Sequence, residues 1–406
     1  MTRNPRHGPI LIAGGGIGGL ATALALARRG IASHVLESRP AFAAEGAGIQ
    51  IGPNGTRILT ELGLAEALSP HVARPASIRV LAGETARSIV ELPLGPWIAA
   101  RHGSPYWVAH RSDLHRALLS NAEASPLITI TLNAAACKLG RTANGVAVEM
   151  RSSGSAPTTP ALSGAEGRGL IAADGLWSDF RSTMFDVAPP RFDNRSAARA
   201  IVSTCDAPPS LRAETTFVWL APGAHVVHYP VRGGREIAVV VIATATEANR
   251  DWSQSLTAAR VLDRTRTFNP QLNRLLEAAA GWRSWSLHTL PPPKRISDGL
   301  VALLGDAAHP ILPFLAQGGV MALEDAAVIA RELAASPGDV ASAFARYQRA
   351  RLSRIARVAH ASRRNGQMFH LGGGLAIARN TAMRALGGAS IMAAYDWLYG
   401  WQDAGP

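Results

Sequence analysis

A glycine-rich motif near the N-terminus has the residue types and the spacing that bind a dinucleotide. The stretch Gly14–Gly19 reads GGGIGG, which places a GxGxxG pattern at Gly14, Gly16 and Gly19, and an acid follows at Glu37. Such glycines let a pyrophosphate approach a helix N-terminus, and such an acid accepts hydrogen bonds from a ribose diol. Because the motif lies between an apolar strand and a helical stretch, it predicts a dinucleotide site, without separating FAD from NAD.

A second candidate ligand contact lies in the stretch 300–325. Asp306 follows the apolar run Leu300–Leu304, and a loop with two prolines then leads into a helix that begins at Gly318 and Gly319. An acid just beyond a buried strand lies where α/β sheets bind ligands, and glycines at a helix start leave N–H groups free for a negative group. An ordinary strand–loop–helix crossover is the alternative for this stretch taken alone.

Side chains suited to proton transfer gather in the sequence HVVHY, which contains His225, His228 and Tyr229. In a strand, His225 and Tyr229 share one face and His228 lies on the other. The first two can therefore face one pocket and serve as a general base or proton relay there. Cross-strand packing at a polar sheet edge is the alternative. We interpret His309, near Asp306, as a brace for its loop rather than as a base.

The dinucleotide motif needs a β–α–β unit to position it. Ile10–Ala13 and Ala32–Leu36 are expected as strands on either side of a helix at Leu20–Arg29. A second glycine-rich stretch, Glu45–Asn54, leads into a helix around Gly55–Leu62. These elements are typical of a nucleotide-binding α/β domain.

A further helix opens at His110–Leu114, with Ser112 or Asp113 as candidate caps. Arg111, at its start, could reach a phosphate. The stretch Ser152–Gly169 is rich in Ser, Gly, Pro and Thr and is expected to form a hairpin loop.

Two regions, 76–107 and 186–282, contain short apolar β-prone segments that indicate a second, antiparallel sheet with helical cover. The chain is expected to return to the first domain at about residue 285. The elements expected in the later chain are strands at Ile78–Leu81, Ser88–Leu92, Tyr106–Val108, Leu170–Ala173, Ala200–Thr204, Thr215–Leu220, Val226–Tyr229 and Ile237–Ile242, a helical stretch at Leu256–Leu276, and helices at Glu324–Leu333 and Val340–Arg364.

Composition limits the classes of function. The 406 residues suit two domains, 47% of them are hydrophobic, and no apolar run is long enough to span a membrane. The formal net charge of +12 is spread along the chain, so attraction of small anions is favoured over nucleic-acid binding. A denser basic run, Arg346–Arg364, is expected to form a solvated, salt-bridged helix face. Cys137 and Cys205 form no CxxC, which indicates a cytoplasmic protein without disulfides or a metal site.

The motifs, read in order, resemble a known family. GGGIGG with Glu37, ADGLWSDFR (Ala173–Arg181) and GDAAHP with its glycine helix start resemble the class A FAD-dependent aromatic hydroxylases. Within that family the sequence is most similar to the salicylate, 3-hydroxybenzoate and 6-hydroxynicotinate hydroxylases. The similarity covers nearly the whole chain and rests further on the segments GAGIQIGPN, YWVAHRSDL, HVVHYP, AQGGVMALEDA and DWLYG.

The resemblance implies the following roles. Gly14, Gly16, Gly19 and Glu37 would hold the ADP half of FAD, and Arg39 would flank the adenosine. Arg111, Asp174 and Asp306 would contact the rest of the cofactor, with Asp174-Gly175 serving both FAD and NAD(P)H and Asp306 binding the ribityl chain. Gly318 and Gly319 would offer N–H groups to the flavin pyrimidine. Tyr229 and His225 would be catalytic, while substrate contacts would come from Gln50, His228, Pro313 and Phe314.

The implied fold is α/β, with a Rossmann-like FAD-binding domain and an interleaved α+β substrate domain on an antiparallel sheet. The expected division assigns FAD-binding parts to 1–75, 109–185 and 285–370, substrate-domain parts to 76–108 and 186–284, and a helical tail to 371–406.

The implied function is monooxygenation of a small phenolic or N-heteroaromatic carboxylate, using non-covalent FAD, NADH or NADPH, and O2, by way of a C4a-hydroperoxyflavin. Two alternatives stay open: a same-fold oxygenase for a larger polyketide, quinone or terpenoid, and a non-catalytic FAD-binding redox sensor or scaffold. A cytoplasmic protein, as a homodimer without nucleic-acid, membrane or metal partners, is expected.

Overall fold

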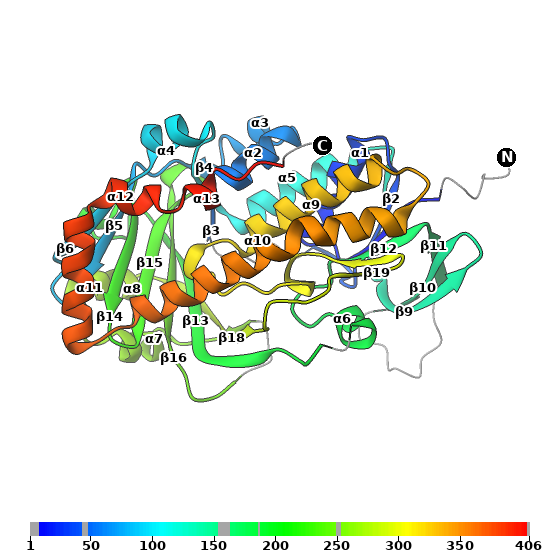
Figure 1. The fold of residues 1–406 in the computed structure, drawn as a ribbon. Helices are drawn as coiled ribbons and strands as arrows, with labels where there is room; N and C mark the ends of the chain where they lie inside the picture. The colour runs from blue at the N-terminus through cyan, green and yellow to red at the C-terminus, as the bar shows by residue number, and fades with distance from the viewer. Residues whose placement is uncertain (1–7, 43–47, 153–162, 186, 249–252, 404–406) are drawn as a thin grey trace.

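The structure is a computed structural model that describes residues 8–42, 48–152, 163–185, 187–248 and 253–403. Two large sheets stand at opposite ends of the molecule, and the long helix α10 (Val340–Phe369) runs alongside both (Figure 1). The expected α/β class with a second, largely antiparallel sheet is confirmed.

The sheet near the N-terminus contains six strands in the order β19-β20-β12-β1-β2-β8. All neighbours run parallel except β19 and β20. The strands are β1 (Ile10–Ala13), β2 (Ser33–Leu36), β8 (Ile128–Thr131), β12 (Gly169–Ala172), β19 (Ser297–Asp298) and β20 (Val301–Leu303). Strands β1, β12 and β20 are buried along their whole length, as their continuous apolar runs predict.

Helices cover this sheet and begin close to its carboxyl edge. The expected helix after the first strand is α1 (Ile17–Ala27), and the helix expected at the glycine pair is α9 (Gly318–Ala334). The helices α1 and α9 pack against each other and α1 also contacts α5 (Arg111–Glu123). Because β1, β12 and β20 are parallel neighbours, the segments that follow them meet at one edge.

The second sheet contains eight strands in the order β17-β18-β13-β16-β15-β14-β5-β6. One face packs against the core of the first sheet and the other against α7 (Ala258–Thr265) and α8 (Pro270–Glu277). The strands are β5 (Ser77–Ala82), β6 (Ser88–Pro93), β13 (Arg191–Ser203), β14 (Thr216–Ala221), β15 (Ala224–Val231), β16 (Glu236–Thr244), β17 (Gln254–Ser255) and β18 (Ala280–Thr289).

Two short sheets and the remaining helices complete the described chain. The sheets are β3-β7-β4, with β3 (Gly48–Ile51), β4 (Val72–Ala73) and β7 (Trp107–His110), and β11-β10-β9, with β9 (Ala135–Thr142), β10 (Gly145–Arg151) and β11 (Ser163–Gly167). The helices are α2 (Pro53–Glu61), α3 (Ala65–Leu68), α4 (Gly95–His102), α6 (Asp179–Met184), α11 (Gly373–Leu386), α12 (Gly388–Ala393) and α13 (Asp396–Tyr399).

Several local predictions differ from the structure. The single helical stretch at Leu256–Leu276 is two helices, because Pro270 begins α8 and the Asn269 side chain caps it. The segment expected at Tyr106–Val108 belongs to the β3-β7-β4 sheet rather than to the eight-stranded one.

The cap prediction for α5 is also wrong. The N-cap is His110, whose Nδ1 accepts a hydrogen bond from the backbone N–H of Ser112, so Ser112 and Asp113 already lie inside the helix.

The division into domains remains our proposal. Two expected boundaries, 108/109 and 284/285, fall inside β7 and β18. Since a strand is one hydrogen-bonded unit, we propose to place these boundaries at the strand ends. Most of the loop expected at 152–169 lies outside the described residues, as do residues 45–47 of the second glycine-rich stretch.

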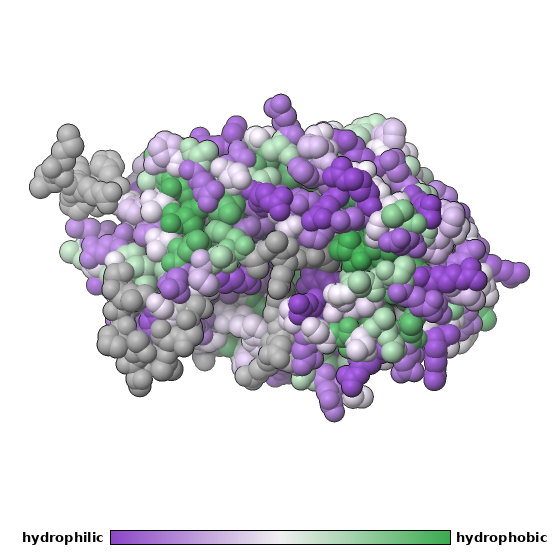
Figure 2. Space-filling model, turned by 180° about the vertical axis from the view of Figure 1, so that it is seen from behind, coloured by the Kyte–Doolittle hydropathy of each residue, from purple (hydrophilic) through white to green (hydrophobic). Residues whose placement is uncertain are grey.

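The face of the molecule opposite to the view of Figure 1 is mostly hydrophilic. Seen from behind, apolar residues gather in two separate areas within a mostly hydrophilic face (Figure 2). Within the described ranges, no helix is long and apolar enough to cross a membrane, and no group of His, Cys, Asp or Glu could hold a metal ion.

A buried ion network joins α9 to α10. Arg351 donates from Nη1 to Glu324 (2.8 Å) and from Nε to Asp325 (2.7 Å), and Arg354 donates from Nη2 to the other oxygen of Glu324 (2.7 Å). The expectation that Arg346–Arg364 forms a solvated, salt-bridged face is therefore wrong in its solvation for Arg351 and Arg354, which form salt bridges but are buried. Both acids are fully buried, so these two arginines neutralise charges that would otherwise be costly.

The same network confirms the interpretation of His309. Its Nε2 lies 2.6 Å from Oδ2 of Asp325, which also accepts from the N–H of Gly305 (3.0 Å). Burial alone would raise the pKa of Asp325, but His309, Arg351 and these hydrogen bonds lower it to about 2. The loop that carries Asp306 is thus fixed to α9 through Asp325.

Replacing Asp325 by Asn should lower the free energy of unfolding by roughly 3–5 kcal/mol, because Arg351 would lose a charged partner inside the core. Chemical denaturation measures this. Asp298→Asn is the matched control, since Asp298 pairs with Arg295 at an exposed site and should cost at most about 1 kcal/mol. Equal losses for both variants would contradict the role of the network.

Acid should reveal the same interaction. The folded pKa of Asp325 lies below the ordinary value of about 3.9 in an unfolded chain, so its contribution is complete above that value and is lost as the pH falls toward 2. Between pH 4 and 2 the Asp325→Asn variant should lose stability less steeply than the unsubstituted protein.

Candidate active site

The turn after β1 is shaped to admit a ligand at the start of α1. A Cβ at Gly14, which has φ +106°, would collide with the carbonyl O of Ala173, and one at Gly19 would collide with the carbonyl O of Gly14. A Cβ at Gly16 would meet no atom within 4 Å. Gly14 and Gly19 are therefore required by packing, whereas Gly16 borders open space at a helix start without a side-chain cap.

Glu37 lies at the end of β2, facing this turn. Its Oε2 accepts the N–H of Gly15 (2.7 Å) and its Oε1 accepts the N–H of Arg39 (2.9 Å). The carboxylate is buried, while the Arg39 side chain is exposed. These bonds fix the acid beside the glycine turn, where a ribose diol would reach it.

Asp174 and Arg181 occupy the loop after β12. Oδ1 of Asp174 is buried without a hydrogen-bond partner among the described residues, and burial raises the pKa of Asp174 although Ser178 opposes the change. Arg181 is buried and donates to the carbonyl oxygens of Leu176 and of Ala307 (3.1 Å). Arg181 thus ties this loop to the Asp306 loop, a role that the sequence did not indicate.

Arg111 and Asp306 interact across the same space. Arg111 is exposed, yet burial lowers its pKa and Asp306 opposes that change. Burial likewise raises the pKa of Asp306, against the effects of Arg111, His309 and Arg181. A side chain that solvent reaches although protein surrounds it lies in an internal hollow. Arg111 and Asp306 therefore belong to one hollow at the sheet edge.

The start of α9 lies beside β3 and the start of α2. Gln317 precedes the helix, has no side-chain cap bond, and accepts a hydrogen bond from Nδ2 of Asn54 (3.0 Å). Gly318 and Gly319 are half-buried, and a Cβ at Gly319 would lie 3.0 Å from Ile49. The first N–H groups of α9 therefore remain available to a negative group, as the glycine pair predicts.

The eight-stranded sheet leaves one uncovered row on the face toward the first sheet. Val227 of β15 pairs with Val240 of β16, which pairs with Arg199 of β13, and all three are partly accessible. In the rows on either side, Tyr229 and His225 are buried. From the strand rise of about 3.3 Å per residue, Tyr229 and His225 stand roughly 13 Å apart along β15.

Tyr229 lies on β15 in the row on one side of the uncovered row. It is buried against Gly48 of β3, and it neighbours Gln50, whose Oε1 accepts the hydroxyl of Tyr106 (2.7 Å). Burial raises the pKa of Tyr229, while Arg199 and a hydrogen bond with Gln50 oppose this. The phenol is therefore protonated at neutral pH and can donate or relay a proton.

His225 lies on β15 in the row on the other side of the uncovered row. Its Nδ1 lies 2.7 Å from Nε2 of His370 at the end of α10, and its ring faces Phe314 at 5.7 Å between centroids. Burial, then His370 and Arg195, lower the pKa of His225 well below its ordinary value. The imidazole is therefore neutral at neutral pH, and its Nδ1 shares one hydrogen bond with Nε2 of His370.

The structure does not bring every expected substrate contact together. His228 lies on the opposite sheet face, buried and stacked on Phe217 at 4.6 Å, so the expectation that it contacts substrate is wrong. Strand alternation already places it there. Pro313 is exposed, and Phe314 is buried against Gly366 beside His225. His370 and Arg199 gave no signal in the sequence, because their partners lie on distant segments.

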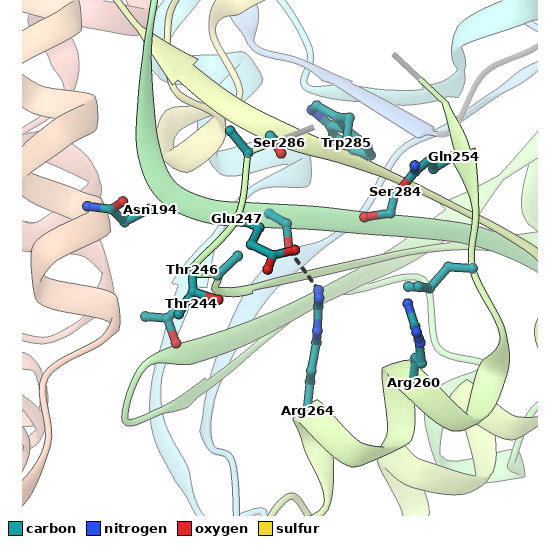
Figure 3. Close-up of a pocket in the computed structure, with 14 residues that line it drawn as sticks. Asn194, Thr244, Thr246, Glu247, Gln254, Arg260, Arg264, Ser284, Trp285 and Ser286 are labelled. Atoms are coloured by element: carbon teal, nitrogen blue, oxygen red, sulfur yellow. Dashed lines mark hydrogen bonds between the residues drawn. The ribbon is translucent and has the colours of Figure 1, made fainter. Parts of the chain in front are cut away.

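A different hollow, of about 930 Å³, lies on the α7 side of the eight-stranded sheet (Figure 3). There Arg264 of α7 donates to the hydroxyl of Ser196 (2.7 Å), and the lining is largely polar. It contains none of the predicted site residues, so we do not assign it to the active site.

The residues at the sheet edge fit FAD. The open space before Gly16, the unpartnered Oδ1 of Asp174, and the uncapped starts of α1 and α9 suit a long anionic cofactor that spans from Glu37 to Gly319. The roles of single residues toward FAD remain our proposal.

Comparison with known proteins gives the class. Residues 8–362 match the family described as "FAD binding domain". The chain is 34% identical to 3-hydroxybenzoate 6-hydroxylase 1 of Aquipseudomonas alcaligenes over 97% of this chain and 98% of that protein. It is 29% identical to 6-hydroxynicotinate 3-monooxygenase of Pseudomonas fluorescens, over 89% and 91% respectively.

The fold agrees with these relatives. A salicylate hydroxylase substrate complex superposes with a TM-score of 0.80, at 22% identity, covering 98% of this chain and 97% of that chain. The chain therefore belongs to the FAD-dependent aromatic hydroxylases of the FAD-binding-domain family. It is a monooxygenase, with FAD as cofactor and NAD(P)H as co-substrate.

Gly16→Val should weaken FAD binding by about tenfold or more, because the side chain would fill the open space before α1. Gly16 has an extended backbone (φ −73°, ψ −175°) that Val adopts, so the apoprotein should stay folded. Flavin fluorescence measures retention and circular dichroism checks folding. Gly338→Val, also in open space, is the control. Unchanged retention would show that the cofactor does not approach Gly16.

Proposed function

We propose that this enzyme hydroxylates a single-ring aromatic carboxylate that carries a phenol or a ring nitrogen. The uncovered row of Val227, Val240 and Arg199, between Tyr229 and His225, carries the proposal. It crosses three neighbouring strands, about 10 Å, which suits one ring. The relatives named for 3-hydroxybenzoate and 6-hydroxynicotinate support the same substrate class.

Bound FAD would supply the transfer of reducing equivalents from NAD(P)H and the activation of O2. The protein would hold it by the α1 turn and Glu37 at the ADP end, by Arg39 beside the adenosine, and by Arg111, Asp174 and Asp306 along its length. The N–H groups of Gly318 and Gly319, at the start of α9, would stabilise negative charge on the reduced flavin ring.

The chain's own part in hydroxylation is to orient and deprotonate the substrate. A phenol becomes more electron-rich when it loses its proton, and the neutral imidazole of His225 would accept that proton. Tyr229 and Gln50 would fix the other side of the ring, and Phe314 would pack beside it. The buried side chains of Tyr229 and His225 on either side would exclude water from the reacting ring.

The remaining expectations are proposals too. We propose a cytoplasmic homodimer without nucleic-acid or membrane partners. The choice between NADH and NADPH is left to experiment.

A panel of aromatic acids should identify the substrate. The holoenzyme is mixed with each acid and with NADH or NADPH, and oxidation of the nicotinamide, peroxide release and product mass are recorded. We expect at least one single-ring acid to stimulate oxidation and to gain one oxygen atom. Stimulation only by larger, uncharged polycyclic compounds would favour the alternative of a larger substrate.

Tyr229→Phe should lower the hydroxylation rate by roughly 10²-fold and divert oxygen to peroxide, because a proton relay at the ring would be lost. Tyr395→Phe is the matched control, since the Tyr395 hydroxyl donates to Oδ1 of Asn365 (3.0 Å) and Tyr395 belongs to no strand of the eight-stranded sheet. Product yield per NAD(P)H oxidised separates the outcomes. Unchanged rate and coupling in Tyr229→Phe would remove Tyr229 from the mechanism.

His225→Asn should slow substrate deprotonation while FAD binding stays intact, and His360→Asn, on an exposed helix face, should not. Because the pKa of His225 is lowered, the unsubstituted enzyme should keep its rate as the pH falls through 6.5 and lose it only at more acidic pH. A rate that halves at pH 6.5 would contradict this assignment.

A further inference from the structure

Arg199 is the charged member of the uncovered row. It lies on β13, on the same sheet face as Ala197, which packs beside Leu312 and Phe314, whereas Ala198 and Ala200 face α7 and α8. Its electrostatic neighbours are Arg111, at the cofactor hollow, and Tyr229. The guanidinium therefore lies between the FAD-binding edge and the catalytic face of the sheet.

This guanidinium has no acid partner among the residues that the structure describes. Among the described residues, it contacts the Trp285 ring, with 3.7 Å from the guanidinium carbon to the ring centre. Other arginines in protected positions differ: Arg351 and Arg354 bond Glu324, and Arg195 on the same strand bonds Asp193 at 2.8 Å. A partly buried charge without a counter-charge is costly, which indicates that a ligand supplies the counter-charge.

The charge persists at working pH. Burial, and then Arg111, lower the pKa of Arg199 to about 10, and Tyr229 opposes the change. Arg199 is therefore a cation at neutral pH. A guanidinium stacked flat on an indole keeps its N–H edge free, and that edge matches the two oxygens of a carboxylate.

We propose that Arg199, stacked on Trp285, binds the carboxylate of the aromatic substrate and so makes the enzyme selective for acids. This rests on the proposed function, because it assigns one group of the same substrate. The anchor at β13 fixes which ring position faces the flavin, while Tyr229 and His225 on β15 act on the phenolic side.

Binding of benzoate and benzamide to the holoenzyme tests the anchor. Both have the same ring, and only benzoate carries the charge; changes in flavin absorbance report binding. In Arg199→Gln the dissociation constant for benzoate should rise between roughly tenfold and hundredfold, with little change for benzamide. Arg199→Lys keeps the charge but loses the paired donors. Its dissociation constant for benzoate should therefore lie between those of the unsubstituted enzyme and Arg199→Gln. Arg283→Gln, opposite Arg199 on β18 but exposed, is the matched control.

The variants also separate the possible sources of the anion. FAD retention and the KM for NADH and NADPH should be unchanged in Arg199→Gln. Weaker FAD retention or a higher KM for NADH or NADPH, with unchanged benzoate affinity, would overturn the proposal. Arg199 would then be assigned to a cofactor phosphate.

If Arg199→Gln does not fold, Arg199→Lys with the same two ligands decides, and equal benzoate affinity in Arg199→Lys and the unsubstituted enzyme overturns the proposal. Failure of the proposed function looks different, since then no aromatic acid stimulates NAD(P)H oxidation by the unsubstituted enzyme. If acids do stimulate oxidation but their KM is the same in Arg199→Gln, only the anchor is wrong.

Discussion

The parallel pairing of β1, β12 and β20 is the constraint on which the cofactor site depends. Each of these strands is short and buried, and the register that joins them is fixed residue by residue, from Ala13 with Ala172 to Ala172 with Leu303. The three loops that follow these strands are more than a hundred residues apart in sequence. They nevertheless begin side by side at the carboxyl edge of the sheet. A dinucleotide that lies across the carboxyl edge meets all three, which no single loop could achieve.

Holding these loops in place requires charges inside the protein. The Asp306 loop is fixed at two points. His309 on the loop contacts Asp325 of α9, and Arg181 donates to the carbonyl oxygen of Ala307. Arg351 balances Asp325 in turn. Each buried charge meets an opposite charge or a set of carbonyl oxygens, so the network positions the loop without leaving unpaired charge behind it. Outside this network, Oδ1 of Asp174 has no hydrogen-bond partner and Arg199 has no acid partner among the described residues, and we propose that ligands meet both.

The sequence predicted what local patterns determine. The strand at Ile10–Ala13 and the helix start at Gly318 match the structure because apolar runs and glycines act over a few residues. Partners from distant segments could not be predicted in this way: the contact of His225 with His370 joins residues 145 apart.

The same limit explains the errors. Arg351 and Arg354 were expected in solvent because a basic run is usually exposed, and only the packing of α9 against α10 buries them. His228 was assigned to the substrate although strand alternation turns it away, so the family resemblance was extended beyond what the backbone allows.

The β15 side and the β13 side of the uncovered row have opposite electrostatic characters, and this difference would give the substrate a direction. On the β15 side the imidazole of His225 is neutral and packed among aromatic rings, which suits a group that gives up a proton. At the β13 side Arg199 is a fixed cation that suits a group already negative. An aromatic acid with a phenol carries both kinds of group on one rigid ring, so only one orientation satisfies the two sites together. Regiochemistry in such a pocket follows from the positions of two strands, β13 and β15, which the strand β16 between them holds at a fixed spacing.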